Sequence, residues 1–496
     1  MIQIQDKNAE NQVYFPKSTN VVGDLVLKLH SELTQKDYTF DVVNESKTSN
    51  YYKFNVNFKS VENGEYTYFI NDTDSGLIRI GNVDEAVSTS TYIDGIEVVQ
   101  YYPQDVRETD YSKEPLTFKI LSYGTINWTT SDSSLTKTIE YKLNDGEWTH
   151  ITSNTEGVKI TVNTGDKIQF RGDNTSYSYG LSYNTFGSST AEFEVEGNIM
   201  SLIDSTNFST LTTLQDNYTF YNLFSNCTGL TSAKNLVLPA TTLADSCYGS
   251  MFRNCTSLTT VPELPATTLA EDCYAGMFGE CTSLITAPIL PATTLANNCY
   301  GGMFRNCTSL TVAPELPATK LANNCYGNMF YGCTSLTTAP SILPATTLYS
   351  QCYQRMFLNC SSLTTAPALP ATTLKFMCYS SMFEGCASLT KAPKLPAMTL
   401  ADYCYQYMFV SCASLTAAPE LPAITLTNSC YSYMFNSCTK LKYIKCLATD
   451  ISASNCTNGW VGGVAATGTF AKNPSMTSWP TGSDGIPDNW TIENNI

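Results

Sequence analysis

Histidine is scarce in this sequence, and long apolar segments are missing. Only two of the 496 residues are histidine, His30 and His150, and they stand far apart. No run approaches the roughly 20 apolar residues that a membrane helix needs. We therefore expect no membrane insertion, and both histidines are predicted to be structural or surface residues.

Motifs of the common enzyme classes are also missing. The chain contains no G-x-S-x-G, no glycine-rich phosphate loop and no H-E-x-x-H. Acidic pairs such as Glu194 and Glu196 stand at alternate positions of one expected strand, where solvation accounts for them. A glycosidase instead needs two carboxylates opposed across a cleft. The sequence predicts a protein that is not an enzyme and uses no cofactor.

Basic residues are outnumbered: 28 Lys and Arg stand against 44 Asp and Glu, for a net charge of −16. Residues 1–200 hold 29 acidic and 16 basic side chains, and residues 201–496 hold 15 and 12. Neither part offers a basic face, so we expect no nucleic-acid partner. The acidity is interpreted as a solubility feature.

Residues 1–30 contain no basic stretch followed by an apolar core, so no secretory signal is predicted. Three alternatives follow. The protein acts in the cell that makes it, it leaves as part of a larger particle, or the chain is a mature fragment with an added Met.

Cysteine, in contrast, is abundant, and its 19 residues reveal a repeat. Two cysteine classes recur every 26 residues, with one step of 27. The unit reads L-P-A-T-T-L-A-x-x-C-Y-x-x-M-F-x-x-C-T-S-L-T-x-A-P-x. Eight full copies cover residues 238–443, and an imperfect copy at residues 218–238 precedes them. The first class is Cys247, Cys273, Cys299, Cys325, Cys352, Cys378, Cys404 and Cys430, and the second follows each of these by eight residues.

Each unit has a pattern that predicts a short helix and a short strand. Cys, Met and the second Cys stand at i, i+4 and i+8, which favours a helix. The residue before it, such as Asp272, Asn298, Asn324 or Ser429, is suited to cap that helix. T-S-L-T-x-A-P predicts a strand ended by proline. One unit alone leaves its Leu, Met, Phe and Tyr exposed, so the units are expected to stack into a solenoid.

The cysteines are interpreted as buried ladder residues. A gap of eight residues does not suit zinc, and no histidine lies beyond position 150. Two helical turns would separate the cysteines of one unit by about 12 Å, beyond the reach of a disulfide. Bridges between units stay open as an alternative. Leucines and phenylalanines are expected to form further ladders, such as Phe304, Phe330 and Phe357.

The M-F-x-x-C-T-S-L-T-x-A-P segments, such as residues 277–288 and 303–314, resemble the BspA-like leucine-rich repeats of bacterial surface proteins. The resemblance covers residues 200–446, although the unit here is a few residues longer than is usual in that family. It implies adhesion to cells, matrix proteins or glycans through a repeated surface.

Residues 116–196 resemble the β-sandwich module that precedes such repeats. Residues 117–120, 138–142, 158–162 and 167–171 alternate in polarity, with turn residues between them. One interpretation is a spacer. The other is a glycan-binding sandwich, for which Trp128, Trp148, Tyr177 and Tyr179 would supply aromatic faces.

Residues 1–110 are expected to form a separate β unit with strands at 38–43, 51–58, 65–71 and 76–80. Residues 12–18 (QVYFPKS), 32–43 and 75–81 (SGLIRIG) resemble N-terminal modules on virion proteins of crAss-like tailed phages of gut bacteria. That resemblance implies attachment to a particle through other virion structural proteins, and it would explain export without a signal.

The predicted fold is multidomain and mainly β with short helices. An N-terminal β anchoring domain (1–110) and a β-sandwich (111–199) precede an α/β leucine-rich-repeat solenoid (200–446). Residues 447–496 break the repeat, are rich in Gly, Asn and Ser, and are expected to cap its end.

The variable positions within each unit are expected to face solvent, and they become bulkier in later units. We select six candidate ligand-facing residues: Arg355, Lys375, Phe376, Tyr403, Tyr407 and Tyr433. The leading hypothesis is a virion fibre or decoration protein that binds a host-surface glycan or protein, as a homo-oligomer. A bacterial cell-surface adhesin and an intracellular scaffold are the alternatives.

Overall fold

The protein is described by a computed structural model that covers residues 109–494 without a gap. Before them it describes residues 2–4, 10–16, 25–31, 36–42, 51–61, 64–70, 74–80, 91–93 and 96–98. The chain forms two compact units, Met1–Thr109 and Asp110–Ile496, which are treated separately below. The described residues are mainly β, as predicted, and their only helical segments are three short 3₁₀ turns: η1 (Tyr111–Lys113), η2 (Ile199–Leu202) and η3 (Phe208–Thr210).

The first unit contains a five-stranded sheet in the order β1-β7-β6-β3-β4, with β2 and β5 paired beside it. Its core includes Leu27, Leu29, Phe58 and Ile70. The four predicted strands are confirmed as β4 to β7, whereas β1 to β3, β8 and β9 were not expected. Of the virion-like stretches, residues 17–18, 32–35, 43 and 81 lie outside the described residues. The strands are β1 (Ile2–Ile4), β2 (Glu10–Pro16), β3 (Leu25–His30), β4 (Asp37–Val42), β5 (Tyr51–Asn57), β6 (Gly64–Ile70), β7 (Asp74–Ile80), β8 (Thr91–Ile93) and β9 (Ile96–Val98).

The second unit begins with two sheets, ordered β13-β12-β15-β10-β18-β19 and β14-β11-β17-β16. The alternation read from the sequence is confirmed, because β10, β12, β14 and β15 cover the four predicted segments. The strands are β10 (Leu116–Ile120), β11 (Gly124–Thr130), β12 (Thr138–Leu143), β13 (Thr149–Thr152), β14 (Val158–Val162), β15 (Lys167–Arg171), β16 (Ser178–Tyr179), β17 (Ser182–Thr185), β18 (Phe193–Asn198) and β19 (Leu230–Val237). β18 pairs in parallel with β19, which belongs to the first repeat. The first sheet therefore continues directly into the repeats.

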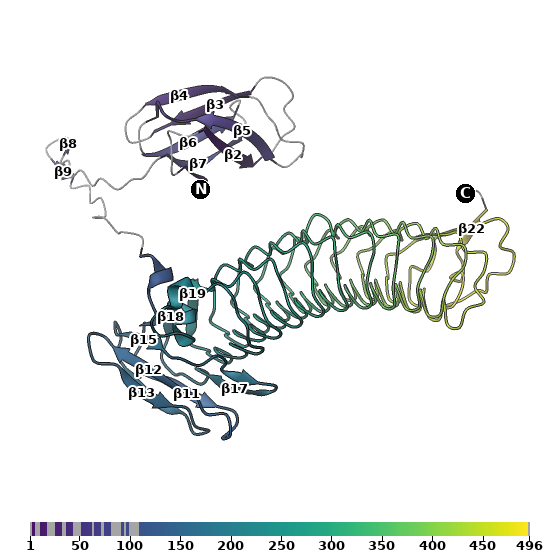
Figure 1. Ribbon diagram of the computed structural model, residues 1–496. Coiled ribbons are helices and arrows are strands. Elements are labelled where there is room, and N and C mark those ends of the chain that lie inside the picture. Colours follow the sequence, from purple (N-terminus) through teal and green to yellow (C-terminus); the bar gives the residue numbers. More distant parts are fainter. Residues whose placement is uncertain are drawn as a thin grey trace. The chain divides into compact units, whose positions relative to one another are not determined.

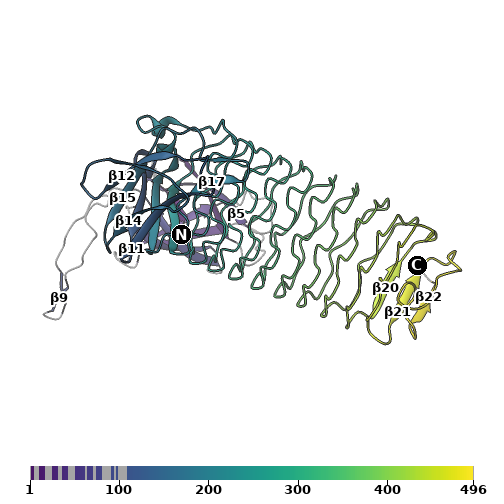
Figure 2. The ribbon, with the colours of Figure 1, turned by 90° about the horizontal axis from the view of Figure 1, so that it is seen from below.

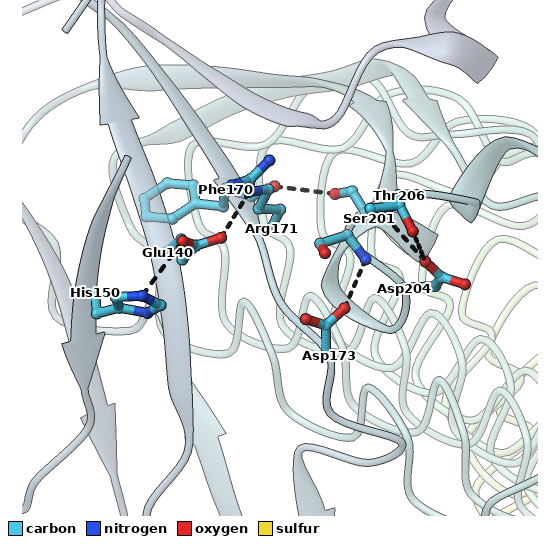
Figure 3. Close-up of polar contacts among 9 residues, drawn as sticks. Glu140, His150, Phe170, Arg171, Asp173, Ser201, Asp204 and Thr206 are labelled. Atoms are coloured by element: carbon cyan, nitrogen blue, oxygen red, sulfur yellow. Dashed lines mark hydrogen bonds and ion pairs between the residues drawn. The ribbon is translucent and has the colours of Figure 1, made fainter. Parts of the chain in front are cut away.

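A small polar network secures this junction (Figure 3). The Ser201 hydroxyl donates to the Phe170 carbonyl (3.0 Å) and accepts from the Leu116 N–H (2.9 Å). Nearby, Glu140 accepts from Arg171 (2.6 Å) and lies 3.4 Å from His150 Nε2. His150 is thus an exposed partner of a carboxylate, in agreement with the prediction of a surface or structural residue.

The predicted short helices of the repeats are wrong. The C-Y-x-x-M-F-x-x-C segments are chains of tight turns, and residues 200–446 contain no α-helix. In the second full repeat, Asp272, Gly276 and Glu280 adopt φ values of 55°, 62° and 66°, so every fourth residue is left-handed. A right-handed helix does not accommodate such residues. The expected helix caps, including Asp272 and Asn298, are in fact the left-handed residues that open each series of turns.

Backbone hydrogen bonds explain this geometry, because alternate N–H groups have different partners. The N–H groups of Tyr274, Gly276 and Phe278 donate to carbonyls of the next unit, at 3.0, 2.8 and 2.9 Å. Those of Met277 and Gly279 donate to the carbonyls three residues back, at 3.2 and 2.9 Å. Half of the donors thus close turns and the other half join neighbouring units. An α-helix would keep all of them within one unit.

The expected strands of each unit are reduced to single parallel bridges. Examples are Thr286 with Val312 and Val312 with Thr338, and a second series links Thr347, Thr373 and Thr399. In the first series, proline, which lacks an N–H, follows two residues after the bridged Thr or Val and limits the extent of pairing. The stack is therefore held mainly through the turns and only locally through strand pairing.

The predicted side-chain ladders are confirmed. Ladder leucines such as Leu336 are fully buried, and Phe304, Phe330 and Phe357 stack at 5.6 and 5.5 Å. A tyrosine ladder, from Tyr248 to Tyr431, runs parallel to the phenylalanines. Both continue into the sheets, where Tyr177 stacks on Phe220 and Phe186 on Phe224. One hydrophobic core therefore extends through the second unit, from Leu116 to Trp490.

The C-terminal segment does not break the repeat where the sequence indicated. Asn455, Gly459 and Gly463 repeat the left-handed pattern, and Phe435 donates its N–H to the Trp460 carbonyl (2.8 Å). These residues form one more turn series with a degenerate sequence. β20 (Tyr443–Cys446), β21 (Thr469–Lys472) and β22 (Thr491–Glu493) form a parallel sheet at the end of the stack (Figures 1 and 2). Trp460 and Trp479 stack on each other at 5.7 Å beside it.

The phenylalanine ladder should dominate the stability of the repeats. We expect Phe330→Ala to lower the free energy of unfolding by about 3–5 kcal/mol, because the cavity lies in a close-packed stack. Tyr353→Phe is the control, since its buried hydroxyl has no hydrogen-bond partner among the described residues and its loss should be neutral or stabilising. Urea unfolding followed by circular dichroism measures both, and a loss below about 1 kcal/mol for Phe330→Ala would contradict the ladder.

Candidate functional site

The outward side of the turns is the most variable surface of the repeats, and we call it the turn face. It consists of the two residues after the ladder tyrosine and the two residues after the ladder phenylalanine in each unit. Cys, Tyr, Met and Phe of the turns point inward and are buried. The turn-face positions accept any side chain that tolerates the backbone there.

A groove with a volume of about 370 Å³ runs along the turn face of the first five units. Gly276, Gly301, Gly302 and Gly327 line it without side chains. Arginines enter from three different units, and polar residues complete the lining. The residues with side chains are Ser250, Arg253, Glu280, Asn298, Arg305, Asn328 and Arg355.

Part of the groove has a structural explanation. The Asn324 amide donates to Asn298 Oδ1 (2.7 Å), and Asn298 donates in turn to Asp272. This side-chain ladder lies over the following turn, where a Cβ on Gly301 or Gly327 would approach an asparagine oxygen at 1.9 Å. Glycine at these two positions therefore leaves room for the asparagine ladder. At Gly302, in contrast, an added Cβ meets only the Arg305 side chain, at 3.9 Å, so the space there is free.

The structure brings four of the six candidate residues into two aromatic pairs. Tyr407 and Tyr433 stack at 5.2 Å with an interplanar angle of 14°, and Phe376 meets Tyr403 edge-on at 5.5 Å. Lys375 is exposed beside Phe376. Arg355 lies apart from them, in the arginine-lined groove. The six residues thus form an aromatic patch and one member of a charged groove rather than a single site.

Four of these six candidates stand on strained backbone. Arg355, Tyr403, Tyr407 and Tyr433 have φ values of 55°, 59°, 57° and 56°. Glycine occupies the equivalent of Tyr407 in two earlier units, at Gly276 and Gly302, where it adopts this conformation without a steric cost. A bulky residue with positive φ costs on the order of 1–3 kcal/mol, and such residues cluster at functional sites. The sequence alone gave no sign of this strain.

A second, more apolar groove was not expected from the sequence. It has a volume of about 660 Å³ and lies against the proline-containing segments of the first two full units. Val261, Pro262, Pro288 and Ile289 line it, and Ile289 is 82% exposed. Its only charged side chains are Lys234 and Glu263.

The sandwich does not offer the aromatic surface that a glycan-binding role was expected to use. Trp128 and Tyr177 are fully buried core residues and meet each other at 5.8 Å. Trp148 is covered by Arg171, whose guanidinium carbon lies 4.1 Å from the ring centroid. Of the four aromatic residues that were considered, only Tyr179 is widely exposed, at 81%.

All nineteen cysteines are buried with free thiols, which confirms their interpretation as ladder residues. Their sulfur atoms have a further role that the sequence did not indicate. The second cysteine of each full unit donates its S–H to the phenylalanine carbonyl of the preceding unit, for example Cys307 to Phe278 at 3.1 Å. Burial raises the pKa of Cys273, Cys281 and Cys325 to about 12, so these thiols are poor nucleophiles and poor metal ligands.

Two further kinds of site concern the part of the chain that the structure describes. No group of three or more His, Cys, Asp or Glu side chains is arranged there to hold a metal ion. Among the same residues, no helix has the length and apolar character to cross a membrane.

The strained tyrosines should be dispensable for folding. We expect Tyr407→Asn to change the free energy of unfolding by no more than about 1 kcal/mol, because relief of the backbone offsets the lost ring stacking. Tyr405→Asn, two residues away in the buried ladder, should instead cost several kcal/mol. Urea unfolding of both variants measures the contrast, and equal losses would show that Tyr407 has a structural role.

The buried thiols should make the protein sensitive to alkali. Unfolded thiols ionise near pH 8.5, whereas the folded ones stay protonated, so their stabilisation is complete below that pH. It is lost as the pH rises toward 12, by on the order of 1 kcal/mol per pH unit for each thiol. We expect constant stability from pH 6 to 8 and cooperative unfolding between pH 9 and 12, followed by circular dichroism. Native structure that persists at pH 12 would contradict this linkage.

Comparison with known families gives one match. The family model for the BspA type leucine rich repeat region matches at residues 201–364, 300–416 and 355–457, which together span more than half of the chain. No significant match was found among curated proteins or solved structures. The matched region contains the turn series, the ladders and the turn face described above, and the chain therefore belongs to the family of BspA type leucine-rich-repeat proteins.

Proposed function

We propose that this protein is a non-enzymatic attachment protein that binds a glycan or protein on a host surface through the turn face of an elongated solenoid. The observation that supports this most is the pair Tyr407 and Tyr433, two stacked tyrosines on left-handed backbone where two earlier units have glycine. Folding gains nothing from strain at these positions, whereas a ligand-binding surface gains two rigid aromatic rings.

The composition of the patch fits an interface. Tyrosine and arginine are enriched at binding surfaces because they combine a large contact area with hydrogen-bonding groups. Phe376, which is 43% exposed, extends the patch toward the preceding unit. The family match supports a surface-adhesion type of protein in general. The ligand and the setting belong to this proposal.

The proposed setting is a phage virion, in which residues 1–110 bind other virion structural proteins and the repeats project outward as a head or tail fibre. A homo-oligomer would suit this role, because several weak sites on one particle gain affinity through avidity. The second candidate setting is a bacterial cell surface, which the family match supports equally. Both settings use the turn face in the same way.

The binding role can be tested with two variants that each remove tyrosine from the surface: Tyr407 and Tyr433 are half-buried, and Tyr443 is 38% exposed. The double variant Tyr407→Asn/Tyr433→Asn should reduce binding of the purified protein to host cells at least tenfold, because it removes the stacked pair. Tyr443→Asn is the control, since Tyr443 is exposed on β20 and lies outside the turn face. Flow cytometry with labelled protein measures both. Unchanged binding by the double variant would refute the proposed surface.

The setting can be tested separately by mass spectrometry of density-purified particles and of the membrane fraction from a culture that expresses the gene. A fixed copy ratio to a capsid protein is the expected result. Recovery with membranes alone would establish an adhesin and would refute the anchoring role of residues 1–110.

A further inference from the structure

We propose that the arginine-lined groove of the turn face binds an anionic polysaccharide, one that carries carboxylate or sulfate groups along its chain. This inference rests on the proposed attachment function and names the ligand class for a part of the turn face distinct from the tyrosine pair. The groove is lined by Arg253, Arg305 and Arg355, with glycine between them.

The distribution of arginine is the first argument. Residues 201–496 contain three arginines, and all three line this groove. Residues 201–496 carry 15 acidic and 12 basic side chains, so three arginines in one groove concentrate positive charge there. Arginine is also the side chain best suited to carboxylate and sulfate, because its planar guanidinium offers paired N–H donors.

The partners of these arginines leave charge available to a ligand. Arg253 pairs with Glu280 at 3.1 Å, and the Arg305 guanidinium lies 5.0 Å from the centroid of the Tyr331 ring. Within residues 109–494, no carboxylate pairs with Arg305 or Arg355. Glu280 is the one acidic side chain that lines the groove, and it pairs with Arg253. Arg305 and Arg355 are therefore the residues expected to contact the anionic groups.

The shape of the groove favours an elongated ligand. Arg253 and Arg305 stand at the same position two units apart, and the unit between them has Gly279 there. Successive ladder rings lie 5.5 and 5.7 Å apart over these units, so the two arginines are separated by about two such steps along the stack. A polymer lying along the stack over the glycine positions could present charges at intervals to both of them.

The lining favours a polysaccharide over an acidic peptide. Ser250, Asn298 and Asn328 supply groups that hydrogen-bond to hydroxyls, as a sugar chain requires. No large aliphatic or aromatic side chain lines the groove, whereas peptide recognition depends on apolar anchors in fitted pockets. The chemistry of the groove therefore matches a ligand covered with hydroxyl and anionic groups.

Binding of the full chain to immobilised dextran sulfate, polygalacturonate and neutral dextran tests the proposal. We expect binding to at least one of the two anionic polymers and none to neutral dextran, and the preferred polymer identifies the anionic group. The double variant Arg305→Gln/Arg355→Gln should weaken that binding at least tenfold. Biolayer interferometry at physiological salt gives the dissociation constants.

Two further variants separate a built groove from general charge attraction. Lys391→Gln/Lys394→Gln removes the same charge from exposed positions of the proline-containing segments and should change the affinity less than threefold. Gly302→Asn fills the groove, and the backbone tolerates it because Asn328 has φ 57° at the equivalent position of the next unit. It should weaken binding at least fivefold without loss of stability. Equal losses in the arginine and lysine variants, or no binding to either anionic polymer, would overturn the proposal.

The outcome is distinguishable from that of the proposed attachment function. If host-cell binding depends on Tyr407 and Tyr433 while Arg305→Gln/Arg355→Gln leaves polymer binding intact, the groove assignment is wrong and the attachment function stands. If neither pair of variants affects cell binding, the attachment function itself is refuted.

Discussion

The division of backbone donors between two directions is the constraint on which the repeats depend. In each series of turns, one N–H closes a turn within its own unit, and the next donates to the neighbouring unit, as Met277 and Phe278 do. This alternation requires a left-handed residue at every fourth position, such as Gly276 and Glu280. Each unit thereby provides the template on which the next one forms. No unit alone supplies hydrogen-bond partners for all of its backbone N–H and C=O groups.

The packing of the interior follows from these hydrogen bonds, because they fix the register between neighbouring units. Because successive units superimpose with a constant offset, identical side chains lie over one another, and the Phe and Tyr rings stack nearly parallel. The second cysteine of each unit also depends on this register, since its thiol donates to the phenylalanine carbonyl of the unit before it. The sheets at the start of the second unit use the same ladders, where Phe186 and Tyr177 continue them. The N-terminal end of the stack is thus covered by Tyr177 and Phe186, which take the places that a further repeat would give to its ladder residues.

The turn face is where the units differ most from one another. Neither the ladders nor the inter-unit hydrogen bonds fix the side chains at its positions. Where it has glycine, the left-handed backbone is relaxed and the surface is hollow, as at Gly302. Where it has Tyr407 or Tyr433, the same backbone carries strain and the surface presents rings. One scaffold therefore produces a polar, arginine-lined groove in its first five units and an aromatic patch in its last three.

The sequence by itself determined the period, the composition of the ladders and the burial of the cysteines, because a strict repeat with invariant apolar positions allows only one inward side. It also located variable positions such as Arg355 and Tyr407 on the surface. It did not reveal the turns, since apolar residues at i, i+4 and i+8 suit both an α-helix and a chain of four-residue turns. Tertiary structure decided between them, because the hydrogen-bond partners of Tyr274 and Phe278 belong to the next unit. The separation of Arg355 from the tyrosine pair and the extra turn around Trp460 likewise arise only when the units stack.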